Sequence, residues 1–112
     1  MAGLLDPYSS TRNGWSRQEA THLLWRCAGG ASAAEVDRVV RDGLEETTTR
    51  LVTLQPESED FTATAGLLHR SALDSGSIAS LRNWWLYRLL ESANPLVEKM
   101  ALVWHNHFAT SN

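Results

Sequence analysis

Residues 94–112 read Asn-Pro-Leu-Val-Glu-Lys-Met-Ala-Leu-Val-Trp-His-Asn-His-Phe-Ala-Thr-Ser-Asn, a stretch that combines a helix start, an apolar stripe and two closely spaced histidines. Pro95 suits the first position of a helix, because its missing N–H would have no intrahelical partner there. Asn94 precedes it and is predicted to cap the helix with its side-chain oxygen. With about 3.6 residues per turn, the predicted helix carries one apolar stripe. The stripe consists of Leu96, Val97, Met100, Val103, Trp104, His107 and Phe108.

The two histidines of this stretch are the first candidates for chemistry. His107 falls on the apolar stripe, whereas His105 falls on its far side, with Glu98 two turns before it. The histidines diverge if the helix continues through them, and they point the same way only if the chain becomes extended. His107 is therefore either a core histidine or a metal ligand or general base. His105 either forms a surface pair with Glu98 or is oriented by it for catalysis or metal binding.

A divalent metal is the cofactor that this pattern suggests, with His105 and His107 as its candidate ligands. Two histidines do not complete a zinc site, since zinc needs a third ligand and usually a fourth. We expect any complete site to draw on chain downstream of these residues. The enzyme hypothesis is a metal-dependent hydrolase or oxidoreductase with His105, His107 and Glu98 as candidate catalytic residues.

An interaction module is the alternative from another functional class. The chain holds five tryptophans, and large aromatic side chains serve either as core anchors or as anchors in protein interfaces. In this hypothesis Trp84, Trp85 and Trp104 anchor a partner or the rest of the chain, and the two histidines only pack.

The composition is that of a soluble globular domain. A hydrophobic content of 43% with 21% charged residues argues against disorder. The net charge is −3 and the basic residues are scattered, so we expect no nucleic-acid binding, which requires clustered positive charge. Neither a signal peptide nor an apolar run of about 18 residues is visible, so we expect no membrane span and take a cytoplasmic location as the default.

Helix signals recur along the preceding chain. Residues 1–14 contain two turn signals and are predicted to form an irregular arm. Two capping boxes follow, Ser16 with Glu19 and Ser32 with Glu35, and each starts a helix that a glycine ends.

The central part of the chain carries weaker signals. A third helix is predicted over residues 44–54, with Leu44, Thr48, Leu51 and Val52 turned inward. Residues 56–76 include an acidic run and predict only a short helix over residues 63–73.

The segment 77–93 has the clearest helical periodicity. Its apolar line, which we expect to be buried, consists of Ile78, Leu81, Trp85 and Leu89. Trp84 lies outside this line, one turn before Arg88, and the two predict an exposed cation–π pair. No strand signal is present, so the fold class is all-α, an irregular array of four to five helices over residues 15–112.

Two blocks of sequence resemble a known family. The first is residues 20–31, Ala-Thr-His-Leu-Leu-Trp-Arg-Cys-Ala-Gly-Gly-Ala. The second is residues 81–88, Leu-Arg-Asn-Trp-Trp-Leu-Tyr-Arg, and it continues through residues 94–100 to Trp-His-Asn-His-Phe-Ala-Thr-Ser at 104–111. These blocks resemble the bacterial family catalogued as domain of unknown function 1800. The sequence departs from the family pattern at Ala28-Gly29, where Gly-Phe is usual, and at Val103, where an aromatic residue is common.

The resemblance implies a long helical protein. Residues 15–112 would be its N-terminal helical portion, incomplete at the C-terminus, and would dock against the remainder of the chain or against a protein partner. It implies no particular biochemical activity. The leading hypothesis is a helical scaffold that contributes His105 and His107 to a site completed by downstream residues, and the metal-dependent enzyme and the interaction module are the alternatives.

Overall fold

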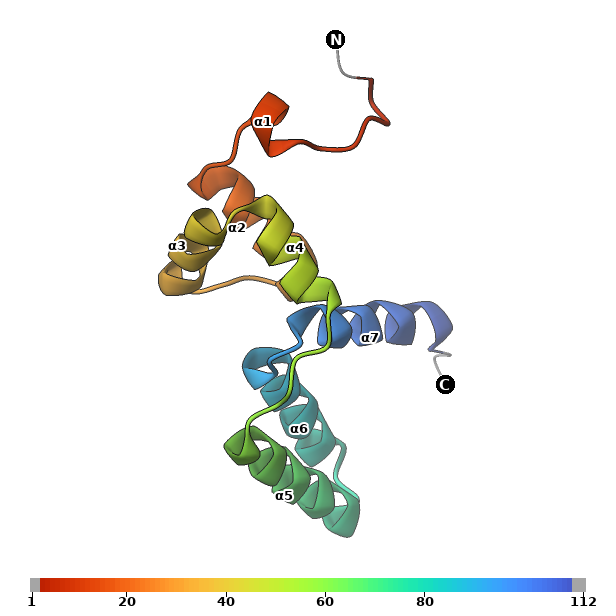
Figure 1. The fold of residues 1–112 in the computed structure, drawn as a ribbon. Helices are drawn as coiled ribbons and strands as arrows, with labels where there is room; N and C mark the ends of the chain where they lie inside the picture. The colour runs from red at the N-terminus through yellow and green to blue at the C-terminus, as the bar shows by residue number, and fades with distance from the viewer. Residues whose placement is uncertain (1–2, 110–112) are drawn as a thin grey trace. The chain divides into compact units, whose positions relative to one another are not determined.

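The structure is a computed structural model that describes residues 3–109, and every regular element in this range is an α-helix. The helices are α1 Ser10–Asn13, α2 Arg17–Ala28, α3 Ala33–Asp42, α4 Leu44–Val52, α5 Glu59–Ser75, α6 Ile78–Glu91 and α7 Pro95–Phe108 (Figure 1). The all-α prediction is confirmed, with seven helices in the described residues rather than four to five. The chain divides into two compact units, Met1–Arg50 and Leu51–Asn112, which are described separately.

Capping chemistry starts the two main helices of the first unit, as predicted. The Ser16 backbone N–H donates to the Glu19 carboxylate at 2.9 Å, and the Ser32 N–H donates to Glu35 at 2.8 Å. Gly29 ends α2 in the left-handed conformation, with φ of 76°, which a residue with a Cβ rarely adopts. The preceding segment, expected to be irregular, contains the single turn α1.

A small apolar cluster joins α2 to α3. Ala20, Leu24, Val36 and Val39 are buried in it, and the partly buried Trp15 packs against it. The Trp15 indole N–H donates to the Val39 carbonyl oxygen at 3.3 Å, so this tryptophan serves as a core anchor with a satisfied polar atom.

The buried face of α4 differs from the prediction. Thr47 is fully buried, whereas Thr48 and Val52 are exposed. The cause is an ion pair at 2.8 Å between Arg50 of α4 and Asp42 of α3, which holds α4 with Thr47 turned inward. The Thr48 hydroxyl instead donates to the Leu44 carbonyl of its own helix at 2.7 Å.

The second unit begins with the largest departure from the sequence prediction. Instead of a short helix over residues 63–73, α5 runs for 17 residues from Glu59 to Ser75. The Ser58 hydroxyl accepts the Phe61 N–H at 3.1 Å and caps the helix. The acidic residues that follow Ser58 stabilise the positive end of the helix dipole, so the acidic run is part of a helix start.

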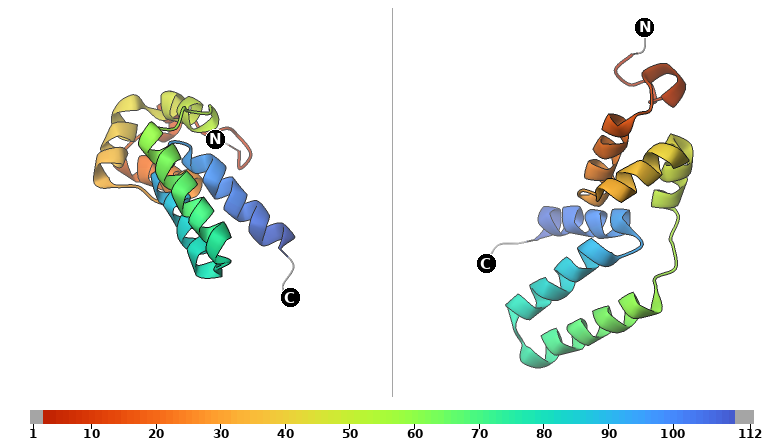
Figure 2. Two further views of the ribbon diagram at one scale, coloured as in Figure 1. Left: turned by 90° about the horizontal axis from the view of Figure 1, so that it is seen from below. Right: turned by 90° about the vertical axis from the view of Figure 1, so that its left-hand side faces the viewer.

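Helices α5 and α6 form an antiparallel pair joined by a tight turn (Figures 1 and 2). The face of α6 that meets α5 carries Trp84, Tyr87 and Arg88 instead of the predicted apolar line. Tyr87 stacks on Phe61 of α5, with ring centroids 5.5 Å apart. The prediction of a buried line is wrong for its first members, because Ile78 and Leu81 are exposed.

Helix α7 starts at Pro95 as predicted, but Asn94 does not cap it. The Asn94 side-chain oxygen accepts the Gln55 N–H at 2.7 Å, and its amide nitrogen donates to the Gln55 carbonyl at 2.9 Å. Asn94 therefore ties the corner between α6 and α7 to the segment that precedes α5.

The apolar stripe of α7 is mostly exposed. Six of its members are exposed: Val97, Met100, Val103, Trp104, His107 and Phe108. The side chain that α7 buries is Glu98, which is 4% exposed. The helix turns this residue toward α6 because its carboxylate pairs with Arg88 there. None of the described helices is both long and apolar enough to cross a membrane.

Candidate functional site

Glu98, the carboxylate of the sequence-predicted site, forms an ion pair with α6. Nη2 of Arg88 lies 2.6 Å from Oε1 of Glu98, and Nε of Arg88 donates to the same oxygen at 3.1 Å. The Arg88 side chain is one-third exposed, whereas that of Glu98 is almost fully buried. The pair thus compensates a carboxylate that would otherwise be costly to remove from water.

Arg88 also belongs to a stacked series of flat side chains between α5 and α6. In order, the series is Tyr87, Phe61, Arg88, Trp84 and His69. The guanidinium carbon of Arg88 lies 5.7 Å from the ring centroids of both Phe61 and Trp84. The rings of Trp84 and His69 are 4.8 Å apart. The predicted Trp84–Arg88 cation–π pair is confirmed, but it is part of the helix interface rather than isolated on the surface.

Glu57 lies at one end of this arrangement and binds the corner between α6 and α7. Its carboxylate accepts the Ser92 hydroxyl at 2.6 Å, the Ala93 N–H at 2.9 Å and the Asn94 amide at 2.9 Å. Burial by itself raises the pKa of the Glu57 carboxyl group. These hydrogen bonds and the charge of Arg88 outweigh that effect and hold its pKa below the ordinary value.

A cleft of about 300 Å³ opens between α5 and α6 beside these groups. Its walls include Glu57, Phe61, Gly66, His69, Trp84 and Arg88. The Glu57 carboxylate, the Arg88 guanidinium and three rings therefore gather around one hollow in the second unit.

His105 and His107 lie elsewhere, on the exposed side of α7. The His105 ring meets Trp85 of α6 edge-on, with centroids 4.9 Å apart. His107 packs against its helix neighbours Trp104 and Phe108 at 5.9 and 4.8 Å. Because α7 continues to Phe108, side chains two positions apart point about 200° from each other around the helix axis.

The structure therefore does not bring the three predicted site residues together. Within residues 3–109, Glu98 is bonded to Arg88 and to neither histidine. The same residues contain no group of three or more histidine, cysteine or acidic side chains placed to hold a metal ion. The roles of His105 and His107 as ligands, and of Glu98 as a base, stay predictions.

Three residues at the cleft were missed from the sequence. Glu57 and Phe61 lie in the part of residues 56–76 for which no helix is predicted, and His69 lies in the short helix predicted over residues 63–73, to which no inner face is assigned. The sequence signal for their position is Ser58. This residue caps α5, so it fixes where the helix begins and which of its residues face inward. Once the helix starts at Glu59, Phe61 and Ala65 fall on its inner face.

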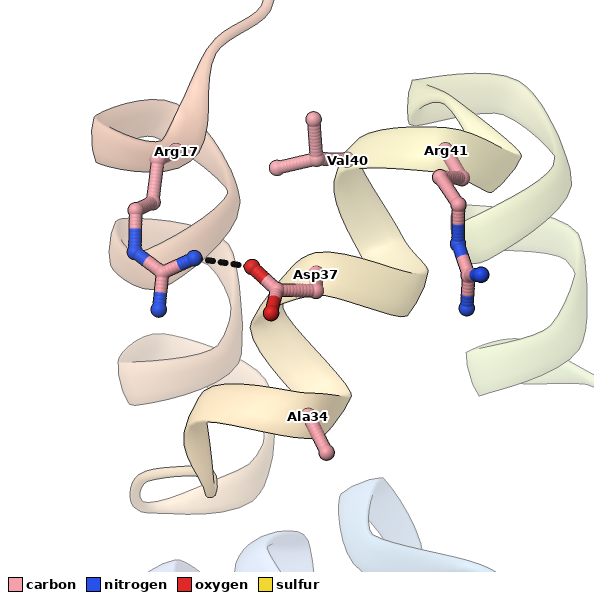
Figure 3. Close-up of a pocket in the computed structure, with 5 residues that line it drawn as sticks. All are labelled: Arg17, Ala34, Asp37, Val40 and Arg41. Carbon is pink, nitrogen blue, oxygen red and sulfur yellow. Dashed lines mark hydrogen bonds and ion pairs between the residues drawn. The ribbon is translucent and has the colours of Figure 1, made fainter.

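The first unit has a separate hollow of about 480 Å³ between α2 and α3 (Figure 3). Arg17 of α2 and Asp37 of α3 point toward each other across it and form an ion pair. Arg41, one turn after Asp37 on α3, points away from this pair (Figure 3). Both members of the Arg17–Asp37 pair are more than half exposed, so the pair adds little to stability.

Comparisons with known proteins give one match. The model of a family described as "Protein of unknown function (DUF1800)" matches residues 22–112. No curated protein and no solved structure matches the chain. The family match covers most of the sequence and includes most of the first block and all of the second block on which the resemblance rested. The chain therefore belongs to the DUF1800 family.

Proposed function

We propose that the second unit is a docking module, and that α7 inserts its apolar face into an apolar groove of a partner protein. The apolar face is defined as Val97, Met100, Trp104 and Phe108, which follow one another at helical spacings of three or four residues. This spacing is the pattern by which an amphipathic helix occupies a groove. The observation that carries the proposal is the exposure of all four side chains, from 42% for Met100 to 70% for Phe108.

The charge distribution favours a protein groove over a lipid surface. No charged residue interrupts the apolar face, and the only lysine of α7 is Lys99, which is partly buried. Helices that lie on membranes are typically rich in lysine and arginine on their polar side, which attracts anionic lipid. Helix α7 lacks that feature and has tryptophan, methionine and phenylalanine, which are enriched in protein interfaces.

The histidines flank this face. By helical geometry His107 falls at one edge of it and His105 near the other, on the side toward α6. In the docked state each imidazole would lie at the rim of the interface, where it can contribute to a site completed by the partner. This arrangement retains the hypothesis of a scaffold that supplies His105 and His107 to a larger site.

A metal-dependent hydrolase or oxidoreductase is the second candidate, and it rests on the same two imidazoles. One ion could hold both only if the last turn of α7 unwound, since the helix separates them. In the helical state each histidine would need ligands from the partner. Glu98 could act as a base in such a site only after leaving Arg88.

Photo-crosslinking tests the docking proposal. A photoreactive phenylalanine analogue replaces Trp104, and in a control protein it replaces Arg70, an exposed residue of α5. Both proteins are irradiated in cells and the adducts are sequenced by mass spectrometry. We expect position 104 to yield an adduct with apolar residues of one protein partner, and position 70 to yield none.

A second substitution shows whether the adduct depends on the apolar face. Met100→Glu should abolish it, whereas Glu91→Gln, on the exposed surface of α6, should leave it intact. An adduct that survives Met100→Glu, one that forms only with lipid, or one that links two copies of this chain would each refute a groove in a partner protein.

A further inference from the structure

We propose that the cleft between α5 and α6 binds a small organic cation, an ammonium or guanidinium group. This site is distinct from the apolar face of α7, and the proposal does not depend on docking. It rests on charge, on aromatic surface and on open space, which meet in the cleft that Glu57, Phe61, Gly66 and Trp84 help to line.

The charge around the cleft is unbalanced in favour of a cation. Arg88 is bound through two of its nitrogens to Glu98, so its charge is already compensated. Glu57 is the second carboxylate of this region. Its Oε1 accepts two hydrogen bonds, whereas its Oε2 accepts one within the described residues, from the Ala93 N–H. An Oε2 lone pair is thus left for an N–H of a ligand.

The aromatic walls already hold a cation. The guanidinium of Arg88 lies 5.7 Å from the ring centroids of both Phe61 and Trp84, within the range in which a ring attracts a positive charge. A ligand cation would meet these two rings where they line the cleft, beside Arg88. Flat rings also favour guanidinium groups because these stack on them.

Gly66 provides the space. It lies inside α5, where glycine costs about 1 kcal/mol relative to alanine. A Cβ built on Gly66 would meet no atom within 4 Å, and the residue does not have a positive φ. Neither packing nor backbone conformation within the described residues therefore requires glycine here. The missing side chain leaves one wall of the cleft open to a ligand.

The experiment uses a matched pair of probes that differ in charge but hardly in shape. N-butylguanidinium and neutral N-butylurea are each titrated into the 112-residue protein at pH 7.5. Chemical shifts of the Gly66 amide and the Trp84 indole N–H report binding. We expect saturable shifts of both signals with butylguanidinium. The affinity for butylurea should be weaker by about tenfold or more, because this probe carries no positive charge. A tenfold difference in affinity corresponds to about 1.4 kcal/mol.

Two variants test the site itself. Gly66→Leu places a bulky side chain at the cleft wall and should weaken butylguanidinium binding by at least about tenfold. Thr64→Leu introduces the same side chain at an exposed position of the same helix that does not line the cleft, so this control should bind as the unaltered protein does. Glu57→Gln, which keeps the side-chain shape, should also weaken binding.

Several results would overturn the proposal. Equal affinity for butylguanidinium and butylurea would show that the cleft binds apolar groups without regard to charge. Tighter binding of butyrate would make it an anion site. Absence of saturable shifts at Gly66 and Trp84, or unchanged binding by Gly66→Leu, would show that no ligand enters the cleft.

Discussion

Arg88→Met removes the charge that compensates a buried carboxylate while retaining a long, unbranched side chain. In the variant, Glu98 remains 4% exposed and loses both hydrogen bonds that Arg88 donates to its Oε1. Removing one member of a buried ion pair typically costs about 3–5 kcal/mol, because the other charge is left without a partner.

We therefore expect Arg88→Met to lower the free energy of unfolding by about 3–5 kcal/mol at pH 7. Urea unfolding at pH 7 measures this loss, with circular dichroism and tryptophan fluorescence as probes. The double variant Arg88→Met/Glu98→Met replaces both charges by apolar groups of similar length and should recover most of the stability. A loss below about 1 kcal/mol in Arg88→Met would refute the assignment of Glu98 as a buried, paired carboxylate.

Four further changes have defined expected outcomes. Asn94→Ala removes three hydrogen bonds that join two segments, so we expect a loss of about 1–3 kcal/mol in urea unfolding. Gly66→Ala should raise the free energy of unfolding by about 0.5–1 kcal/mol, because alanine favours a helix and meets open space. Thr47→Val removes a fully buried hydroxyl that has no hydrogen-bond partner among the described residues, and should raise the melting temperature by a few degrees. Metal content measured by mass spectrometry on the complete natural protein should drop in both His105→Ala and His107→Ala if these imidazoles are ligands.

Each of these predictions has a result that would contradict it. Asn83→Ala, at an exposed position of α6, serves as the control for the Asn94 variant, and equal stability of the two would remove the role of Asn94 as a tie. A destabilised Gly66→Ala would show that the cleft wall is packed. A destabilised Thr47→Val would reveal a partner for that hydroxyl. Unchanged metal content in both histidine variants would exclude them as ligands.

Local signals in the sequence were sufficient to predict where several helices begin and end. A capping box such as Ser16 with Glu19 acts through atoms three residues apart, and Pro95 acts through its own ring. These effects require no knowledge of the rest of the fold. The start at Ser58 obeys the same chemistry, but the acidic run that follows it is also typical of a loop, so the serine alone does not reveal the helix.

The direction in which each helix faces could not be predicted in the same way. Periodicity shows that a helix has an apolar stripe, but not which neighbour it meets. On α6 the inner face is set by Trp84 and Arg88, because Phe61 and His69 of α5 offer them flat surfaces. On α7 it is set by the charge of Arg88, which draws in Glu98. In both cases the contacting residues lie at least ten positions apart in sequence, so no local pattern reveals the contact.

The apolar residues that α6 and α7 leave exposed have a joint consequence for docking. The exposed residues Ile78 and Leu81 share their helix line with Trp85, whose ring contacts His105 of α7, so the outer line of α6 adjoins α7. Complete burial of one large apolar side chain contributes about 1.5–3 kcal/mol. The apolar face of α7 has four such side chains, each about half-exposed, so covering all four contributes on the order of 4 kcal/mol. Association costs at least about that much. An interface confined to α7 would therefore bind weakly, and a stable complex requires that the partner also cover the outer line of α6.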